Sequence, residues 1–218
     1  MNRAPTETNQ PMNAFVTYLH QGGFMMYPLI LCSVLAIGII LERAYTFRKA
    51  TAIDPEELLE EIKQSYKPGD HGAAAARLME DAKTPYSRIF ARGLKNADRP
   101  AEAIDMAMSQ EAANEIPSLE NYLPGLRTII TICPLLGLLG TIAGMIASFK
   151  EVARSGLSSP TAVMGGVSEA LVSTATGISI AVVGLIFHNY FGNLVKRFVE
   201  DMEYYGSELT NFLTGRVA

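Results

Sequence analysis

Three long runs of uncharged, mostly apolar residues constrain the fold of this chain more than any other feature. They cover residues 22–41, 128–149 and 170–195. A helix rises about 1.5 Å per residue, so about 20 residues are needed to cross roughly 30 Å of hydrocarbon. Each run is long enough, and no other segment of the 218-residue sequence is comparable. The sequence therefore predicts an integral membrane protein with three transmembrane helices.

The distribution of Lys and Arg predicts how these helices are oriented. Most of the 18 basic residues lie between the first and second runs, and Lys196 and Arg197 directly follow the third. Cytoplasmic segments of membrane proteins carry an excess of Lys and Arg. We therefore expect, in order, a periplasmic N-terminal segment 1–21, transmembrane helix 22–41, a cytoplasmic helical domain 42–127, transmembrane helix 128–149, a short periplasmic loop 150–169, transmembrane helix 170–195 and a cytoplasmic C-terminal helix 196–218.

The cytoplasmic segments carry helix signals. Asp54 and Thr84 each precede a proline, a pattern in which the polar side chain caps a helix and the proline takes its first position. Another helix is expected from Ala101 toward the second span, and the third span stays compatible with a helix to about Leu213. No segment shows a convincing two-residue alternation of apolar and polar residues. The predicted fold class is an all-α membrane protein whose second and third spans extend into a helical cytoplasmic domain.

Charge and reactive residues exclude several classes of function. The formal net charge of −4 gives no reason to expect nucleic acid as a partner. Cys32 and Cys133 both fall inside apolar runs, where they act as small hydrophobic residues. The sequence has no phosphate-binding loop, metal-ligand spacing or nucleophile motif, so we expect no enzyme, cofactor or metal. A small-molecule transporter is disfavoured because the three spans show no internal repeat.

The second span carries a stripe of small and polar residues at helical spacing. Gly140 and Gly144 form the small-xxx-small pattern that lets transmembrane helices approach closely. The stripe has two interpretations, a packing seam between helices or a sparsely polar lumen in which hydroxyl groups face water or another helix. Its members are Pro134, Gly137, Thr141, Gly144 and Ser148.

The third span begins next to a carboxylate, Glu169, which is expected at its outer mouth. A charge near the bilayer centre costs about 2.5–3.5 kcal/mol even on the lenient insertion scale, and less toward the interface. Ser173 and Thr176 share the helix face of Glu169, whereas Thr174 lies well off that face on an ideal helix. Glu169 is then either an interfacial anion or the start of a polar track. His188 is interpreted as an interfacial side chain near the cytoplasmic end.

These two spans resemble the MotA/TolQ/ExbB proton-channel family. The resemblance rests on Pro134–Thr141 followed by Gly144, and on Glu169-Ala170-Leu171 continuing through Thr174 to Gly177. The first span agrees, with Tyr27-Pro28-Leu29 and Leu41-Glu42-Arg43. Three spans rather than four indicate the ExbB/TolQ branch.

The resemblance implies a mechanism and partners. Such proteins form a homopentamer in the bacterial inner membrane, and an ExbD- or TolR-like single-span partner places its helices in the central pore. An intramembrane Asp of that partner is the main proton carrier. Residues matching Thr141 and Thr174 line the pore beside it, and the glutamate matching Glu169 guards the outer end. The family usually has a proline where this chain has Val183.

The leading functional hypothesis is an ExbB-type subunit that couples proton flow to a TonB-like protein and so energises outer-membrane import. A TolQ-type subunit, working through a TolA-like protein in envelope integrity or constriction, is an alternative, as is a related motility motor. A passive scaffold is the remaining possibility.

Overall fold

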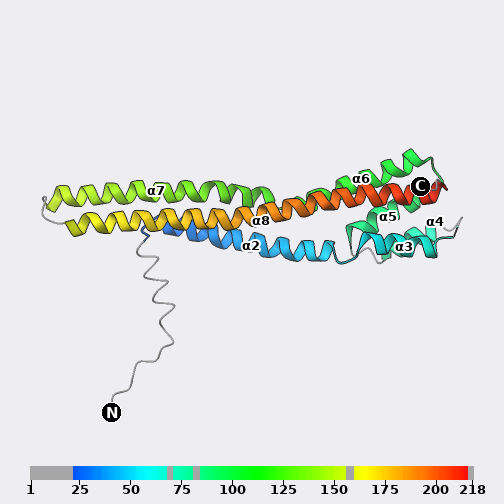
Figure 1. The fold of residues 1–218 in the computed structure, drawn as a ribbon, viewed down its shortest axis with the longest axis horizontal. Coiled ribbons are helices and arrows are strands. Elements are labelled where there is room, and N and C mark those ends of the chain that lie inside the picture. Colours follow the sequence, from blue (N-terminus) through cyan, green and yellow to red (C-terminus); the bar gives the residue numbers. More distant parts are fainter. Residues whose placement is uncertain (1–21, 68–70, 81–83, 156–159, 216–218) are drawn as a thin grey trace, which may run out of the picture. The chain divides into compact units, whose positions relative to one another are not determined.

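The structure is a computed structural model that describes residues 22–67, 71–80, 84–155 and 160–215. The expected periplasmic segment 1–21 lies outside this description. The described residues form helices and no strand, which confirms the all-α prediction (Figure 1). The helices are α2 (Met26–Ala50), α3 (Pro55–Ser65), α4 (His71–Glu80), α5 (Pro85–Lys95), α6 (Ala101–Glu120), α7 (Leu123–Ser155) and α8 (Pro160–Thr214).

The helices divide between two compact units. Residues 22–39 and 125–188 form one, called here the apolar unit, and residues 40–124 and 189–215 form the other, called the polar unit. Three helical stretches are long and apolar enough to cross a membrane, which confirms the predicted number of spans. Helix α8 continues through both units to Thr214, as the pattern after the third run predicted.

In the apolar unit, α7 runs alongside the first part of α8, and the start of α2 packs against both (Figure 1). Met26, Leu29 and Cys133 form a buried cluster, onto which partly buried side chains of all three helices pack. Cys32 is one of these, so both cysteines pack as small hydrophobic residues. Large apolar side chains on the outer faces of the three helices are exposed in the single chain, as expected of helices that face lipid.

The polar unit contains α3 to α6 and the end of α8. The predicted caps are present: the Asp54 side chain accepts a hydrogen bond from the backbone N–H of Glu56, and Thr84 accepts one from Ser87. The unit has a core of its own, with Phe90, Leu94, Ile104 and Leu209 completely buried.

One feature of the fold differs from the sequence expectations. Helix α7 continues to Ser155 and α8 begins at Pro160, so the described residues of segment 150–169 are helical rather than a loop. The helix expected from Ala101 toward the second span is α6, which ends at Glu120, and Tyr122 takes a positive φ of 62° before α7 begins.

Arg43 has a structural role at the junction between α6 and α7. Arg43 is 2% exposed, and its guanidinium donates hydrogen bonds to the backbone carbonyls of Ser118 (2.9 Å) and Leu119 (3.1 Å). It also lies over the Tyr122 ring, 5.5 Å from its centroid. The last carbonyls of a helix lack partners within the helix, so Arg43 caps the end of α6.

Candidate functional site

The stripe of small residues on α7 packs directly against α8. A Cβ atom at Gly137 would lie 2.9 Å from the Cα of Thr174 and 3.0 Å from the carbonyl oxygen of Ser173. A Cβ at Gly144 would lie 2.9 Å from the carbonyl oxygen of Gly166. These are backbone atoms, which cannot move aside as a flexible side chain can. The close approach of the two helices, called here the α7–α8 seam, therefore depends on glycine.

Hydroxyl groups of three candidate residues lie within this seam. Ser173 is completely buried and donates a hydrogen bond to the carbonyl oxygen of Ala170 (2.9 Å), while Ser148 is 5% exposed and donates to that of Gly144 (3.0 Å). Thr174 donates across the seam to the carbonyl oxygen of Gly137 (2.9 Å). Hydrogen bonds between transmembrane helices contribute about 0.6 kcal/mol on average. In the single chain, Ser148 and Ser173 thus pack inside the seam, whereas Thr174 is only half-buried.

Thr141 and Thr176 are also half-buried, and each bonds within its own helix. The Thr141 hydroxyl donates to the carbonyl oxygen of Leu138 (2.7 Å), and that of Thr176 donates to Val172 (2.8 Å). The bond made by Thr141 satisfies its hydroxyl hydrogen and leaves the oxygen able to accept. Pro134, one helical turn before Leu138, is half-buried at the edge of the stripe.

Helix α2 covers one edge of the seam. It packs against Leu136 on α7 and Ile180 on α8. At about 100° per residue, Thr141 lies about 40° from Gly137 on the side opposite Leu136. Thr174 likewise lies about 60° from Gly177 on the side opposite Ile180. Both threonines therefore follow the edge of the seam that α2 leaves open, called here the free edge.

Glu169 lies on the other side, toward α2. Its half-buried side chain packs against Gly23, just before α2 begins. Thr176 is on the same face of α8, as the ideal-helix count predicted, and that face turns toward α2 rather than toward the free edge. The chain thus brings Thr141 and Thr174 together and holds Glu169 apart from them. The role of Gly23 was missed in the sequence, where the only signal was a Gly-Gly pair at the start of an apolar run.

His188 and Val183 are the remaining positions that the sequence singled out. His188 is half-buried near the end of the predicted third span, and Val183 is 51% exposed. Among the residues that the structure describes, no group of three or more His, Cys, Asp or Glu side chains could hold a metal ion.

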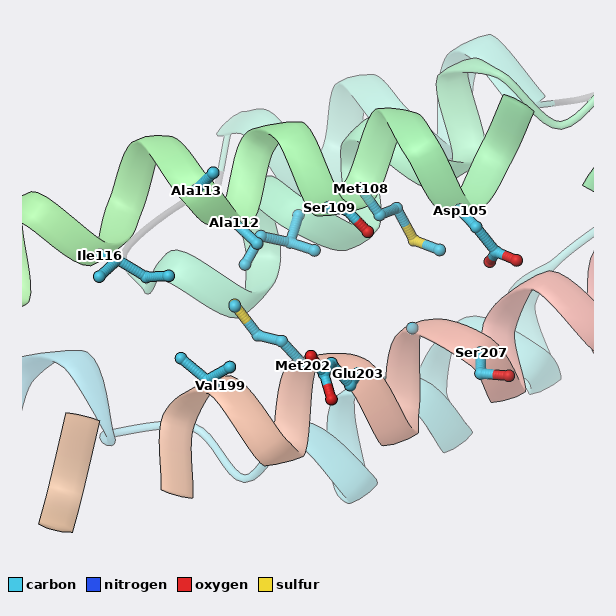
Figure 2. Close-up of a pocket in the computed structure, with 12 residues that line it drawn as sticks. Asp105, Met108, Ser109, Ala112, Ala113, Ile116, Val199, Met202, Glu203 and Ser207 are labelled. Atoms are coloured by element: carbon cyan, nitrogen blue, oxygen red, sulfur yellow. The ribbon is translucent and has the colours of Figure 1, made fainter. Parts of the chain in front are cut away.

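The polar unit has a cavity of about 340 Å³ between α6 and α8 (Figure 2). Met108 and Met202 extend into the space between the two helices, and most of the other lining residues are apolar or small. Of its two carboxylates, Asp105 accepts a hydrogen bond from Thr210, and Glu203 lies at the rim. We assign this cavity no catalytic role.

Comparison with known proteins gives consistent matches. The model of the MotA/TolQ/ExbB proton channel family matches residues 81–204. A putative biopolymer transport protein ExbB-like 3 from Synechocystis is 36% identical, over 81% of this chain and 84% of the relative. A Tol-Pal system protein TolQ from Haemophilus influenzae is 30% identical, over 62% of each chain. An ExbB homolog from Methanothermobacter thermautotrophicus is 25% identical over 88% of this chain and 69% of the relative.

Proposed function

Because the chain belongs to the MotA/TolQ/ExbB proton channel family, we propose that it is the channel subunit of a proton-driven, ExbB-type motor in the bacterial inner membrane. In this proposal it works with an ExbD-like partner and drives a TonB-like protein for outer-membrane import. One observation supports the proposal beyond the family: the Thr174 hydroxyl bonds across the α7–α8 seam to Gly137. From the helix angles, Thr141 and Thr174 would then share the edge of the seam away from the contacts of α2.

The free edge can serve proton transfer only together with a partner. Hydroxyl groups do not hold a proton's charge at neutral pH, but they can donate to or accept from a carboxyl group or a water molecule beside it. The titrating group is therefore an Asp on the partner's transmembrane helix, and Thr141 and Thr174 form the polar track beside it. One proton crossing the membrane releases about 2.3 kcal/mol per 100 mV, which the motor converts into motion.

In a closed ring of subunits, the free edges of all subunits together line a central lumen. We propose a homopentamer in which α7 and α8 line the centre and α2 faces the lipid. Support comes from the exposed apolar residues Leu135, Leu138 and Met145 on α7, which require covering by a neighbour or by lipid. Native mass spectrometry in mild detergent should show pentamers, and a stable monomer would exclude this arrangement.

The proposed orientation places the N-terminus and the end of α7 in the periplasm and the polar unit in the cytoplasm. Its support is the excess of Lys and Arg between the first and second runs. Arg154 and Glu57 are both exposed. In whole cells, a cysteine introduced at Arg154 should react with a membrane-impermeant thiol reagent, and one introduced at Glu57 should not. Equal labelling at the two positions would refute the orientation.

A TolQ-type role is the second candidate, supported by the similarity to TolQ of Haemophilus influenzae. The two roles differ in what a deletion strain loses. An ExbB-type subunit is needed for TonB-dependent uptake, whereas loss of a TolQ-type subunit leaves uptake intact and weakens the envelope against detergents. Proton flux in vesicles tests the function common to both: it should require this chain and its partner together. If vesicles that contain both this chain and its partner show no proton flux, the chain acts as a passive scaffold.

A further inference from the structure

Gly23 adopts a backbone conformation that only glycine takes readily. Its φ is +67°, in the left-handed region that is costly for a residue with a Cβ atom. The space is also occupied, because a Cβ built on Gly23 would overlap the carboxyl group of Glu169. Glycine therefore avoids two costs here, the strain of a positive φ and the displacement of a carboxylate from α8.

The turn around Gly23 is tied to the start of the first span. The backbone N–H of Met26 donates to the carbonyl oxygen of Gly23 (3.1 Å), and that of Tyr27 donates to Phe24 (3.3 Å). The carboxylate of Glu169 packs against this hydrogen-bonded turn, in the room that Gly23 leaves by lacking a Cβ atom.

We infer that Gly23 is a positioning residue for Glu169, so that the first span sets where the carboxylate at the outer mouth lies. The inference rests on the proposed function for the role of Glu169, but the contact itself does not. It gives α2 a part in the proton path, although α2 lies on the far side of the seam from Thr141 and Thr174. Any residue with a Cβ at position 23 must displace the carboxylate or the turn.

A double-mutant comparison of the purified chain tests the contact without a partner. Gly23→Ala should lower the midpoint of thermal unfolding by about 3 °C or more when Glu169 is present. In a Glu169→Ala background the loss should be smaller, since only the backbone strain remains. Gly165→Ala, which places its Cβ in open space within α8, is the control and should change the midpoint equally in both backgrounds. Equal losses from Gly23→Ala with and without Glu169 would overturn the inference.

If the Gly23→Ala variant does not accumulate in cells, a disulfide cross-link tests the same contact. In a chain lacking Cys32 and Cys133, Gly23→Cys with Glu169→Cys should form a disulfide when membranes are treated with copper phenanthroline. Replacing Glu169 removes the group that excludes a Cβ at position 23, so this variant can fold. Gly38→Cys with Glu169→Cys should not cross-link, and failure of the first pair would also overturn the inference.

The functional consequence is measured separately, as proton flux with the partner present. Gly23→Ala should reduce flux at least fivefold, in the direction of Glu169→Ala, and Gly165→Ala should retain it. Combining Gly23→Ala with the shorter Glu169→Asp should recover part of the loss relative to Gly23→Ala alone. Normal flux in Gly23→Ala would overturn the positioning role. If Glu169→Ala itself leaves flux unchanged, the proposed role of Glu169 in proton transfer is wrong. The unfolding comparison then still tests whether Gly23 and Glu169 are in contact.

Discussion

Replacing Gly137 with Ala should separate the α7–α8 seam and lower the stability of the apolar unit. The added Cβ would lie 2.9 Å from the Cα of Thr174 and 3.0 Å from the carbonyl oxygen of Ser173. Carbon atoms in favourable contact lie about 3.5–4.0 Å apart, so the helices must part by about 0.5–1 Å. The same movement lengthens the hydrogen bond from the Thr174 hydroxyl to the carbonyl oxygen of Gly137, which is 2.9 Å in the intact seam.

The size of the effect follows from a matched comparison with Gly38→Ala. Gly38 is a glycine inside α2 with no atom within 4 Å of an added Cβ. Both substitutions gain helix propensity of about 1 kcal/mol, which cancels in the difference. Overpacking at Gly137 costs about 1–3 kcal/mol, and the weakened interhelical hydrogen bond about 0.6 kcal/mol. Gly137→Ala should therefore be about 1.5–3.5 kcal/mol less stable than Gly38→Ala.

The chain's own cysteines give a suitable assay. Cys133 is completely buried and Cys32 partly buried in the apolar unit, so a thiol-reactive fluorescent dye reports when that unit opens on heating. Gly137→Ala should become reactive at a lower temperature than Gly38→Ala, which should match the unmodified chain or exceed it. Equal transition temperatures for the two variants would refute the conclusion that the stripe on α7 packs against α8.

Substitutions at three further residues have expected outcomes. Glu169→Ala should strongly impair proton-coupled uptake and Glu169→Asp less so, measured by complementation of a deletion strain; full activity of the alanine variant would remove Glu169 from the mechanism. Arg43→Met should lower the unfolding free energy by about 2–4 kcal/mol, because two carbonyls at the end of α6 lose a charged donor, and a change below about 0.5 kcal/mol in denaturant titration would contradict the capping role. His188→Ala should leave uptake nearly unchanged, and a large loss would contradict its interpretation as an interfacial side chain.

The sequence was sufficient for the fold class because its signals are local. Three uncharged runs of sufficient length can only be membrane helices, and Asp54 and Thr84 cap α3 and α5 as their positions before proline predicted. The helical continuation of α7 to Ser155 was not predictable in the same way. Hydropathy marks where a span leaves the membrane but does not distinguish a helix that continues from a loop.

The arrangement of the site was only partly predictable, because the role of a helix face depends on which other helices pack against it. Periodicity correctly grouped Glu169 with Ser173 and Thr176 on one side of α8. It could not show that α2 would cover this side, or that Thr174 would share the free edge with Thr141. Thr174 was singled out by the family resemblance alone. The capping role of Arg43 could not be predicted for the same reason, since its partners are carbonyls about 75 residues away in sequence.

Proton flux through valine variants at the free edge tests the central claim most directly. Thr141→Val and Thr174→Val remove the hydroxyl groups at nearly constant volume and should leave the oligomer assembled. In proteoliposomes that contain the chain and its single-span partner, an imposed membrane potential should drive protons inward for the unmodified chain. The account predicts that each valine variant loses most of this flux while its native mass is unchanged. Full flux in both variants would show that the free edge of the α7–α8 seam does not line the proton path.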